Sequence, residues 1–394
     1  MARVLSAAQA RIARVRSQRL AGPPGADAHD VVHGLLVVSA QDTRASRLAV
    51  RPRCRGTGID AVAVVRACNQ ERSLVRTWLL RGTLHMAAAE DVRWLVALLG
   101  PVFAAGGGPR RLRLGLDEDT LARGLVALRE ILAAEGPLTR ATLVEAIAIK
   151  GVVVAPRSQA PAHLVGYAAK RGLLCRGPDL EHDEPTYVLL DDWVDRPGRS
   201  APELTLEREP EVALAELARR YLRAHAPAGD ADFAAWSALP LHQAKRGFRH
   251  LAAACELDTV DAAGSPAAVL TRNSEPPPDP DEPTGASHLR LLGHFDPYLL
   301  GYRNRDLVLS PRFAKRIQAG GGIIHPAILL EGHVVGTWHQ RRAPDLLTVV
   351  AEPFNREGLT STILPALEAE AADVGRFLGT DATLTVTVNP GQVG

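Results

Sequence analysis

The order of helical and strand patterns constrains the fold of this 394-residue chain more than any other feature. In the N-terminal quarter, three helical patterns precede two strand patterns, at residues 4–21, 31–39, 60–69, 74–80 and 83–87. Asp30 and Asp60 are suited to begin the second and third helices, and Arg81-Gly82 is suited to turn the chain between the strands. Helices followed by a short hairpin are the order of a winged helix, which often binds nucleic acid.

A second group of patterns repeats this order. It is predicted to contain helices at 119–134, 140–149 and 161–171 and strands at 172–177 and 186–190. The loop between these strands carries Asp179, Glu181, Asp183 and Glu184, so we do not expect it to contact phosphates.

A third group contains three helical patterns, at 211–224, 229–236 and 241–253. The last of these would be the recognition-type helix of a helix-turn-helix. Lys245, Arg246 and Arg249 give it a basic face.

The C-terminal part is predicted to be a smaller β-rich element. Strand patterns occur at 289–292, 307–309, 327–330, 334–338, 346–350 and 383–388, with a helix at 359–376. We therefore predict an α+β, mostly helical fold, in which three tandem winged-helix units and a β-rich element can curve around a duplex. The predicted segments are 1–105, 114–200, 208–270, a Pro-rich acidic loop at 271–287, and 288–394, with a flexible basic joint at 106–113.

Charge is distributed unevenly along the chain. Residues 1–113 contain 18 arginines, no lysine and 7 acidic residues, a balance of +11, whereas the remainder has a balance of −9. A GC-rich genome explains arginine in place of lysine, but it does not explain why acidic residues are scarce in this part alone. The asymmetry indicates a polyanion as the partner of the N-terminal part.

Composition also disfavours several classes of protein. The sequence has no apolar run of membrane-spanning length, and arginines interrupt the N-terminal stretch where a signal core would lie, so a cytoplasmic protein without a membrane partner is expected. The four cysteines, Cys54, Cys68, Cys175 and Cys255, form no C-x-x-C pair. Buried free thiols are therefore expected rather than a metal or redox site, and no cofactor is predicted.

One polar stretch, Ser39-Ala40-Gln41-Asp42, separates the apolar pattern at 31–39 from a run of arginines. We expect it at the C-terminal end of a buried helix, where its side chains are aimed into a cleft. At helical spacing Arg44, Arg47 and Arg51 share one face, which fits a helix that faces phosphates. A solvated face without a partner is the alternative, and Arg53 and Arg55 continue the run.

Together these stretches resemble the winged-helix DNA glycosylases of the AlkZ and YcaQ type. Two stretches are fairly specific in combination: W-L-L-R-G-T-L-H at 78–85 and D-P-Y-L-L-G-Y at 296–302. Further similarity lies at 40–49, 90–95 and 332–338, so the resemblance extends over nearly the whole chain.

The resemblance implies three tandem winged-helix units and a β-rich element around a concave, basic DNA channel. It also implies excision of bulky N7-alkylated purines, and in some members the unhooking of interstrand crosslinks. The biological role would be self-resistance to a genotoxic natural product or base excision repair, in the bacterial cytosol. The family's catalytic motif, Q-Φ-Q or Q-Φ-D, maps onto Ser39-Ala40-Gln41, so the second glutamine is present and serine replaces the first.

The chemistry of this reaction suits these residues. An N7-alkylated purine is cationic and leaves readily, so cleavage of the C1′–N9 bond needs a placed water and stabilising dipoles. Gln41 would position that water, and Ser39 would hold it with its hydroxyl. Asp42 is either the base, or a residue that caps a helix or pairs with Arg44. The lysines all lie outside the first unit, so a Schiff-base lyase step is not expected and the enzyme would be monofunctional.

The predicted partner is double-stranded DNA carrying alkylated purines, bound by a monomer. The predicted DNA contacts are Arg44, Arg47, Arg51, Arg53, Arg55, Arg76, Arg81, Thr83, His85, Lys245, Arg246 and Arg249. For His85, packing within the hairpin is the alternative to a contact with sugar or phosphate. Because Ser39 departs from the motif, a non-catalytic winged-helix DNA-binding protein, such as a regulator or a damage-binding shield, also fits the sequence.

Overall fold

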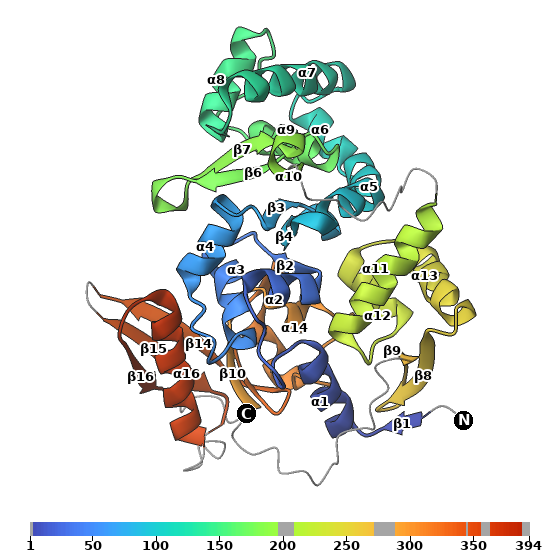
Figure 1. Cartoon of the computed structure of the whole chain (residues 1–394), viewed down its shortest axis with the longest axis vertical. Helices are drawn as coiled ribbons and strands as arrows, with labels where there is room; N and C mark the ends of the chain where they lie inside the picture. The colour runs from blue at the N-terminus through green and yellow to red at the C-terminus, as the bar shows by residue number, and fades with distance from the viewer. Residues whose placement is uncertain (1–2, 196–208, 272–287, 344–345, 356–362, 388–394) are drawn as a thin grey trace. The chain divides into compact units, whose positions relative to one another are not determined.

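The computed structural model describes residues 3–195, 209–271, 288–343, 346–355 and 363–387 (Figure 1). The chain forms two compact units, one from residues 1–64 and 215–394 and one from residues 65–214. It passes from one to the other within α4 (Ala61–Asn69) and α11 (Pro210–His225). The first unit is therefore discontinuous in sequence, and its N-terminal segment is completed by residues far along the chain.

The N-terminal segment of the discontinuous unit consists of short elements. These are β1 (Arg3–Leu5), α1 (Ala7–Ser17), α2 (Ala28–Leu35), β2 (Val37–Ser39), α3 (Thr43–Val50) and the 3₁₀ turn η1 (Arg51–Arg53). The predicted helix at 4–21 is shorter, because Ser6 begins α1 with a capping box in which it exchanges hydrogen bonds with Gln9. Residues before this cap form β1, which pairs in parallel with β8 (Leu257–Ala262).

The third group of predicted helices is confirmed as α11, α12 (Asp230–Ser237) and α13 (Leu241–Ala253). A hairpin of β8 and β9 (Ser265–Leu270), which was not predicted, follows α13. Together with β1 it forms a three-stranded sheet in the order β1-β8-β9. The predicted Pro-rich loop lies outside the described residues apart from Thr271.

The predicted C-terminal β-rich element is a five-stranded sheet in the order β10-β13-β14-β15-β16. Its strands are Leu289–Leu292, Ala327–Leu330, His333–Arg342, Leu347–Pro353 and Ala382–Val386. Helix α16 (Ile363–Leu378) packs on β10, β15 and β16 (Figure 1). The strand predicted at 307–309 is wrong: these residues form a turn, and Val308 and Leu309 are apolar because they enter the core with Val15, Leu20 and Tyr298.

Short elements connect the strands of this sheet. They are α14 (Pro297–Leu300), η6 (Pro311–Phe313), α15 (Ala314–Ile317), β11 (Gln318–Gly320) and β12 (Ile323–Ile324). Strands β11 and β12 pair antiparallel with a bulge, and three glycines with positive φ, Gly320, Gly321 and Gly322, turn the chain between them.

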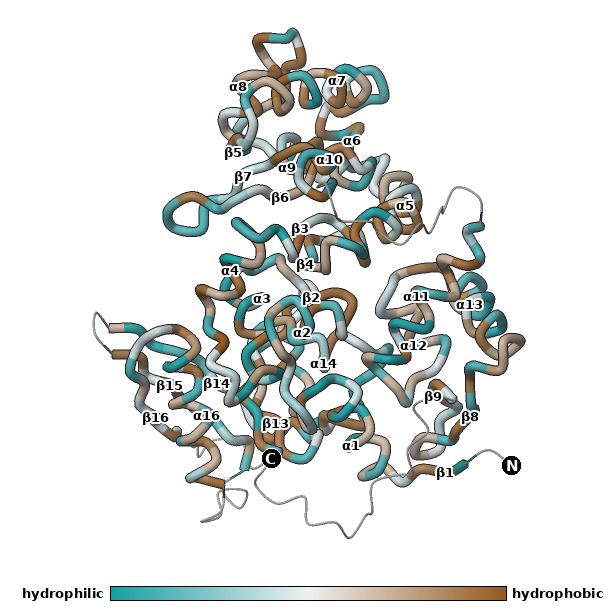
Figure 2. The backbone as a smooth tube through the Cα atoms, in the orientation of Figure 1, coloured by the Kyte–Doolittle hydropathy of each residue, from teal (hydrophilic) through white to brown (hydrophobic). Residues whose placement is uncertain are grey.

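In the continuous unit, both predicted hairpins are confirmed. The elements are β3 (Leu74–Trp78), η2 (Leu80–Gly82), β4 (Leu84–Ala88), α5 (Ala89–Ala105), α6 (Gly108–Arg113), α7 (Glu118–Glu135), β5 (Leu138–Thr139), α8 (Arg140–Ile149), α9 (Ala160–Lys170), β6 (Leu174–Asp179), η3 (Glu181–Asp183), β7 (Pro185–Leu189) and α10 (Leu190–Val194). A sheet in the order β5-β7-β6 packs with α7, α8 and α9 around one apolar core. The acidic β6–β7 turn is hydrophilic (Figure 2).

Two predictions for this unit are wrong. The apolar pattern at 92–99, followed by Gly100-Pro101, predicts a helix that stops at Gly100, but α5 continues through Pro101. Gly100 packs closely on the end of α9: a Cβ there would lie 2.1 Å from the carbonyl oxygen of Lys170. The expected flexible joint at 106–113 contains α6, and Arg111 is buried there, with its guanidinium donating to the carbonyls of Ala104 and Gly106.

The structure also tests the predictions that the thiols are buried and that the chain has no membrane-spanning segment. Cys54, Cys68 and Cys175 are buried as predicted, whereas Cys255 is exposed, contrary to the prediction, because it follows the end of α13 with a positive φ. Within the described ranges, no helix combines the length and apolar composition that a membrane span needs.

Candidate active site

The predicted catalytic stretch follows a strand rather than a helix. Helix α2 begins at Asp27, whose carboxylate accepts a hydrogen bond from the Asp30 N–H at 2.7 Å, so the prediction that Asp30 is the cap is wrong. Leu36 then adopts a positive φ of 67° and ends the helix. The β-branched residues Val37 and Val38 continue as the buried strand β2, which favours an extended backbone up to Ser39.

Ser39 has an unusual environment at the end of β2. The residue is 5% exposed, and its hydroxyl oxygen has no hydrogen-bond partner among the described residues. A buried hydroxyl left unsatisfied costs about 1–3 kcal/mol, so a water or a polar atom of a ligand would be stabilised here. Two residues later, Gln41 is exposed.

Asp42 begins α3. Its Oδ1 accepts a hydrogen bond from the Ala45 N–H at 2.9 Å, which is the capping role that the sequence left open. The cap fixes the direction in which the chain leaves Gln41. The catalytic role predicted for Asp42 stays a prediction, as do those of Ser39 and Gln41.

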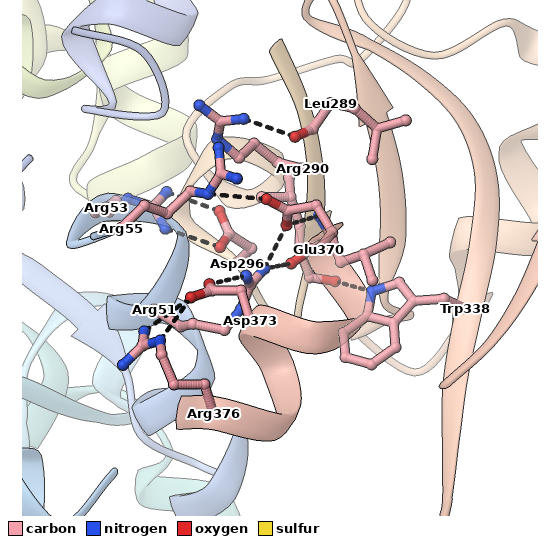
Figure 3. A network of polar contacts seen from close by, with 12 residues as sticks. Arg51, Arg53, Arg55, Leu289, Arg290, Asp296, Trp338, Glu370, Asp373 and Arg376 are labelled. Carbon is pink, nitrogen blue, oxygen red and sulfur yellow. Dashed lines mark hydrogen bonds and ion pairs between the residues drawn. The ribbon is translucent and has the colours of Figure 1, made fainter. Parts of the chain in front are cut away.

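Arg51 does not share the exposed face of α3. Helix α3 gives way at Arg51 to a 3₁₀ turn containing Pro52, and the Arg51 side chain is fully buried. Its guanidinium lies 2.8 Å from Glu370 and 2.6 Å from Asp373 and donates to the Leu291 carbonyl (Figure 3). Burial, the largest effect, lowers its pKa, but the two carboxylates outweigh it and the pKa of Arg51 is raised.

Arg53 is buried in the same way. Its guanidinium donates to both oxygens of the buried Asp296, each at 2.9 Å (Figure 3). It also donates to the backbone carbonyl and the side-chain oxygen of Gln18. The expectation that Arg51 and Arg53 contact phosphates is therefore corrected: both cations are enclosed and neutralised within this unit.

The other arginines of the run keep some exposure. Arg44 is exposed, and Arg47 and Arg55 are half-buried. Arg55 Nε lies 3.2 Å from Glu370 Oε1, at the open edge of the buried network. Contact of these three residues with phosphate stays a prediction.

In the continuous unit, the hairpin of β3 and β4 holds Arg76, Arg81, Thr83 and His85. Arg76 is 6% exposed, and it donates to the Asp179 carboxylate and to the Gly177 carbonyl. Arg76 is therefore also corrected from a phosphate contact to a structural ion pair. Arg81 and Thr83 are half-buried and remain predicted contacts.

His85 is packed inside the hairpin, which corrects the predicted DNA contact. The side chain is 1% exposed, its Nδ1–H donates to the Thr83 carbonyl at 2.9 Å, and Arg81 lies 3.4 Å from Nε2. Burial, followed by repulsion from Arg81, lowers the pKa of His85 to about 3. The ring is neutral at physiological pH, so it offers a phosphate no positive charge.

The basic face of α13 is accessible. Lys245, Arg246 and Arg249 are exposed, as predicted for a recognition-type helix. Lys245 and Arg249 border a cleft of about 700 Å³ between α13 and the β8–β9 hairpin. These residues lie in the discontinuous unit, as do Ser39, Gln41 and Asp42.

Comparisons with known proteins agree with the predicted resemblance. A family model described as DNA glycosylase AlkZ-like matches residues 32–377. The chain belongs to this family.

This AlkZ-like DNA glycosylase has a relative in Streptomyces sahachiroi, named "Interstrand DNA cross-link repair glycosylase". The two are 29% identical over 395 residues, which cover 93% of this chain and 95% of the relative. The solved structure of Streptomyces sahachiroi DNA glycosylase AlkZ matches with a TM-score of 0.78 and 26% identity, covering 98% of this chain and 100% of that chain. The predicted enzyme class and the mixed α+β fold are thereby confirmed.

Several residues that shape the site of this AlkZ-like glycosylase were not predicted. Asp296, Glu370 and Asp373 neutralise the buried arginines, and the charge of Asp42 acts on His294. A signal for two of them is present in the sequence, because Asp296 begins the D-P-Y-L-L-G-Y stretch and His294 directly precedes it. Nothing local marks the two acidic residues of α16.

Proposed function

We propose that this AlkZ-like glycosylase hydrolyses the N-glycosidic bond of bulky N7-alkylated purines in double-stranded DNA, interstrand crosslinks among them. The cross-link repair activity named for the relative from Streptomyces sahachiroi supports this substrate class. The role is self-resistance to a genotoxic natural product or base excision repair. The protein acts as a monomer in the bacterial cytosol.

One observation carries the catalytic assignment. The buried Ser39 hydroxyl lacks a hydrogen-bond partner in the described part of the chain, and it stands two residues before the exposed amide of Gln41. Ser39 and Gln41 hold the attacking water, the first by its hydroxyl and the second by its side-chain carbonyl. Asp42 contributes a negative charge beside this water and beside the developing oxocarbenium ion.

The fold supports a further proposal on DNA binding. We interpret the three successive groups of helices as tandem winged-helix units that form, with the β-rich element, a concave channel. DNA phosphates are contacted by the accessible residues of the predicted set: Arg44, Arg47, Arg55, Arg81, Thr83, Lys245, Arg246 and Arg249. The buried Arg51, Arg53, Arg76 and His85 are not part of this proposal.

Release of the modified base tests the proposal. Duplex oligonucleotides treated with a panel of intercalating N7-alkylators would be incubated with the full chain, and the freed alkylpurine quantified by mass spectrometry. We expect release of intact alkylpurine and an abasic site that alkali cleaves. Tight binding of alkylated duplex without any release across the panel would overturn the proposal in favour of a damage-binding shield.

A further inference from the structure

The residue before His294 packs against α3, the helix that Asp42 caps. The preceding residue, Gly293, is packed so closely that a Cβ there would lie 3.2 Å from Leu48 Cβ and 3.8 Å from the Ala45 carbonyl oxygen. Ala45 is the residue whose N–H binds Asp42. Gly293 therefore holds the chain just before His294 against the face of α3 that carries Ala45 and Leu48, and the charge of Asp42 at the start of α3 acts on the His294 ring.

The imidazole of His294 is held in one tautomer. Its Nδ1 lies 3.2 Å from the Ile324 carbonyl oxygen, which also accepts the Phe295 N–H at 3.3 Å. A carbonyl oxygen only accepts, so Nδ1 carries the proton and Nε2 keeps a lone pair in the neutral ring. Phe295, the next residue, adopts a φ of 57°. In residues other than glycine this left-handed conformation is strained and clusters at functional sites.

The surroundings of His294 include groups that favour the neutral ring and groups that favour the protonated ring. The residue is half-buried, and the charged or titratable groups that act on it are Asp42 and His325, whose ring centroid lies 5.6 Å away. Burial, the largest effect, lowers the pKa of His294 and His325 lowers it further, whereas the Ile324 hydrogen bond and Asp42 raise it. The net pKa is below the ordinary value of 6.5, so the ring is a free base at neutral pH.

We propose that His294 Nε2 is the proton acceptor for the water that attacks C1′, and that Asp42 stabilises the resulting imidazolium. The inference rests on the proposed function and adds a base to it. Gln41 has no basic atom of useful strength, and Oδ1 of Asp42 is engaged as a helix cap. A neutral imidazole beside a carboxylate supplies the missing step.

The step is balanced without a further reactant. The water oxygen forms a bond to C1′ while the C1′–N9 bond breaks. The electron pair of the broken bond moves to N9 and cancels the positive charge of the N7-alkylated purine. One proton of the water moves to His294 Nε2 and is later released to solvent.

The test compares His294→Gln with His333→Gln in single-turnover excision between pH 5 and 8. His333 is a matched control, because it is another half-buried histidine of the same unit with a pKa lowered mainly by burial. We expect the wild-type rate to be level above pH 6.5 and to fall only where acid protonates His294, which happens below its ordinary pKa of 6.5. His294→Gln should be about 100-fold slower and independent of pH, and His333→Gln should match wild type.

A second arm separates catalysis from folding. His294→Ala should retain affinity for alkylated duplex and regain part of its excision rate when imidazole is added, which a structural role would not allow. A His294→Gln variant with the wild-type rate and pH profile would reject this inference alone. Absence of release by wild type would instead reject the proposed function together with it.

Discussion

Arg53 and Asp296 form a buried ion pair with two parallel hydrogen bonds of 2.9 Å, although the two residues are 243 positions apart in the chain. Asp296 also accepts the Tyr298 N–H and begins α14. The pair therefore fastens the end of the catalytic segment to the stretch that carries His294. A guanidinium bound at two points resists rotation, which suits a site that must hold a water in place.

We expect Asp296→Asn to destabilise the discontinuous unit by about 3–5 kcal/mol, because the Arg53 cation would stay buried without its counter-ion. Urea unfolding monitored by tryptophan fluorescence measures the change. Arg342→Met, at an exposed end of β14, is the control and should lie within about 0.5 kcal/mol of wild type. Equal stability of the two variants would mean that the pair contributes nothing.

Gln41→Ala should reduce excision about 100-fold while affinity for alkylated duplex stays unchanged, because the exposed amide acts on the water in the proposed reaction. Single-turnover base release and a binding isotherm on the same duplex provide the two readouts. A variant that excises at the wild-type rate would remove Gln41 from the mechanism.

Ser39→Ala separates the two residues of the motif. We expect excision to fall about 10-fold, because one of the two groups that hold the water is lost. The free energy of unfolding should not fall, since the Ser39 hydroxyl binds no described residue and its removal leaves no partner unpaired. A marked loss of stability with unchanged excision would show that the hydroxyl is structural.

Lys245→Ala should weaken DNA binding at every sequence and reduce the slope of log K against log salt by about 1, as for a single lost phosphate contact. Lys150→Ala is the control, because Lys150 is already paired with Glu130 at 2.6 Å. Titrations of duplex at several salt concentrations distinguish the two. An unchanged slope for Lys245→Ala would place α13 away from the DNA.

The buried His85 should make the continuous unit less stable in acid. Its pKa is about 3 in the folded protein against 6.5 in the unfolded chain, so between these values the unfolded state binds the proton and the folded state does not. Stability therefore falls as pH falls below 6.5. Between pH 7 and 5 wild type should lose about 2 kcal/mol more than His85→Gln, measured by urea unfolding. Parallel curves for the two proteins would contradict the burial of a neutral ring.

Local signals predicted the elements that local interactions determine. Asp60 caps α4 through the Ala63 N–H, and Arg81-Gly82 turns the β3–β4 hairpin with positive φ at both residues, as the sequence indicated. The end of α2 was not predictable, because the residue that takes the positive φ is a leucine, which disfavours that conformation.

The candidate site was predictable in its motif but not in its arginines. In sequence, Arg51 and Arg53 have the spacing of a phosphate-facing surface, and no local pattern reveals that they are buried. Their partners Glu370 and Asp296 are 319 and 243 residues away. The spacing of charged residues in a sequence shows where the charges are. Only the tertiary fold shows which counter-ion each of them has.

The distance between Arg51 and Glu370 has a consequence for synthesis of the protein. At about 5–20 residues per second, a ribosome needs roughly 15–60 seconds after Arg51 to reach the residue that neutralises it. During this interval the nascent N-terminal segment carries uncompensated cations beside apolar strands. The N-terminal segment can complete its packing only after α16 has been synthesised. A truncated product would therefore expose an apolar, positively charged segment to the nucleic acids of the cell.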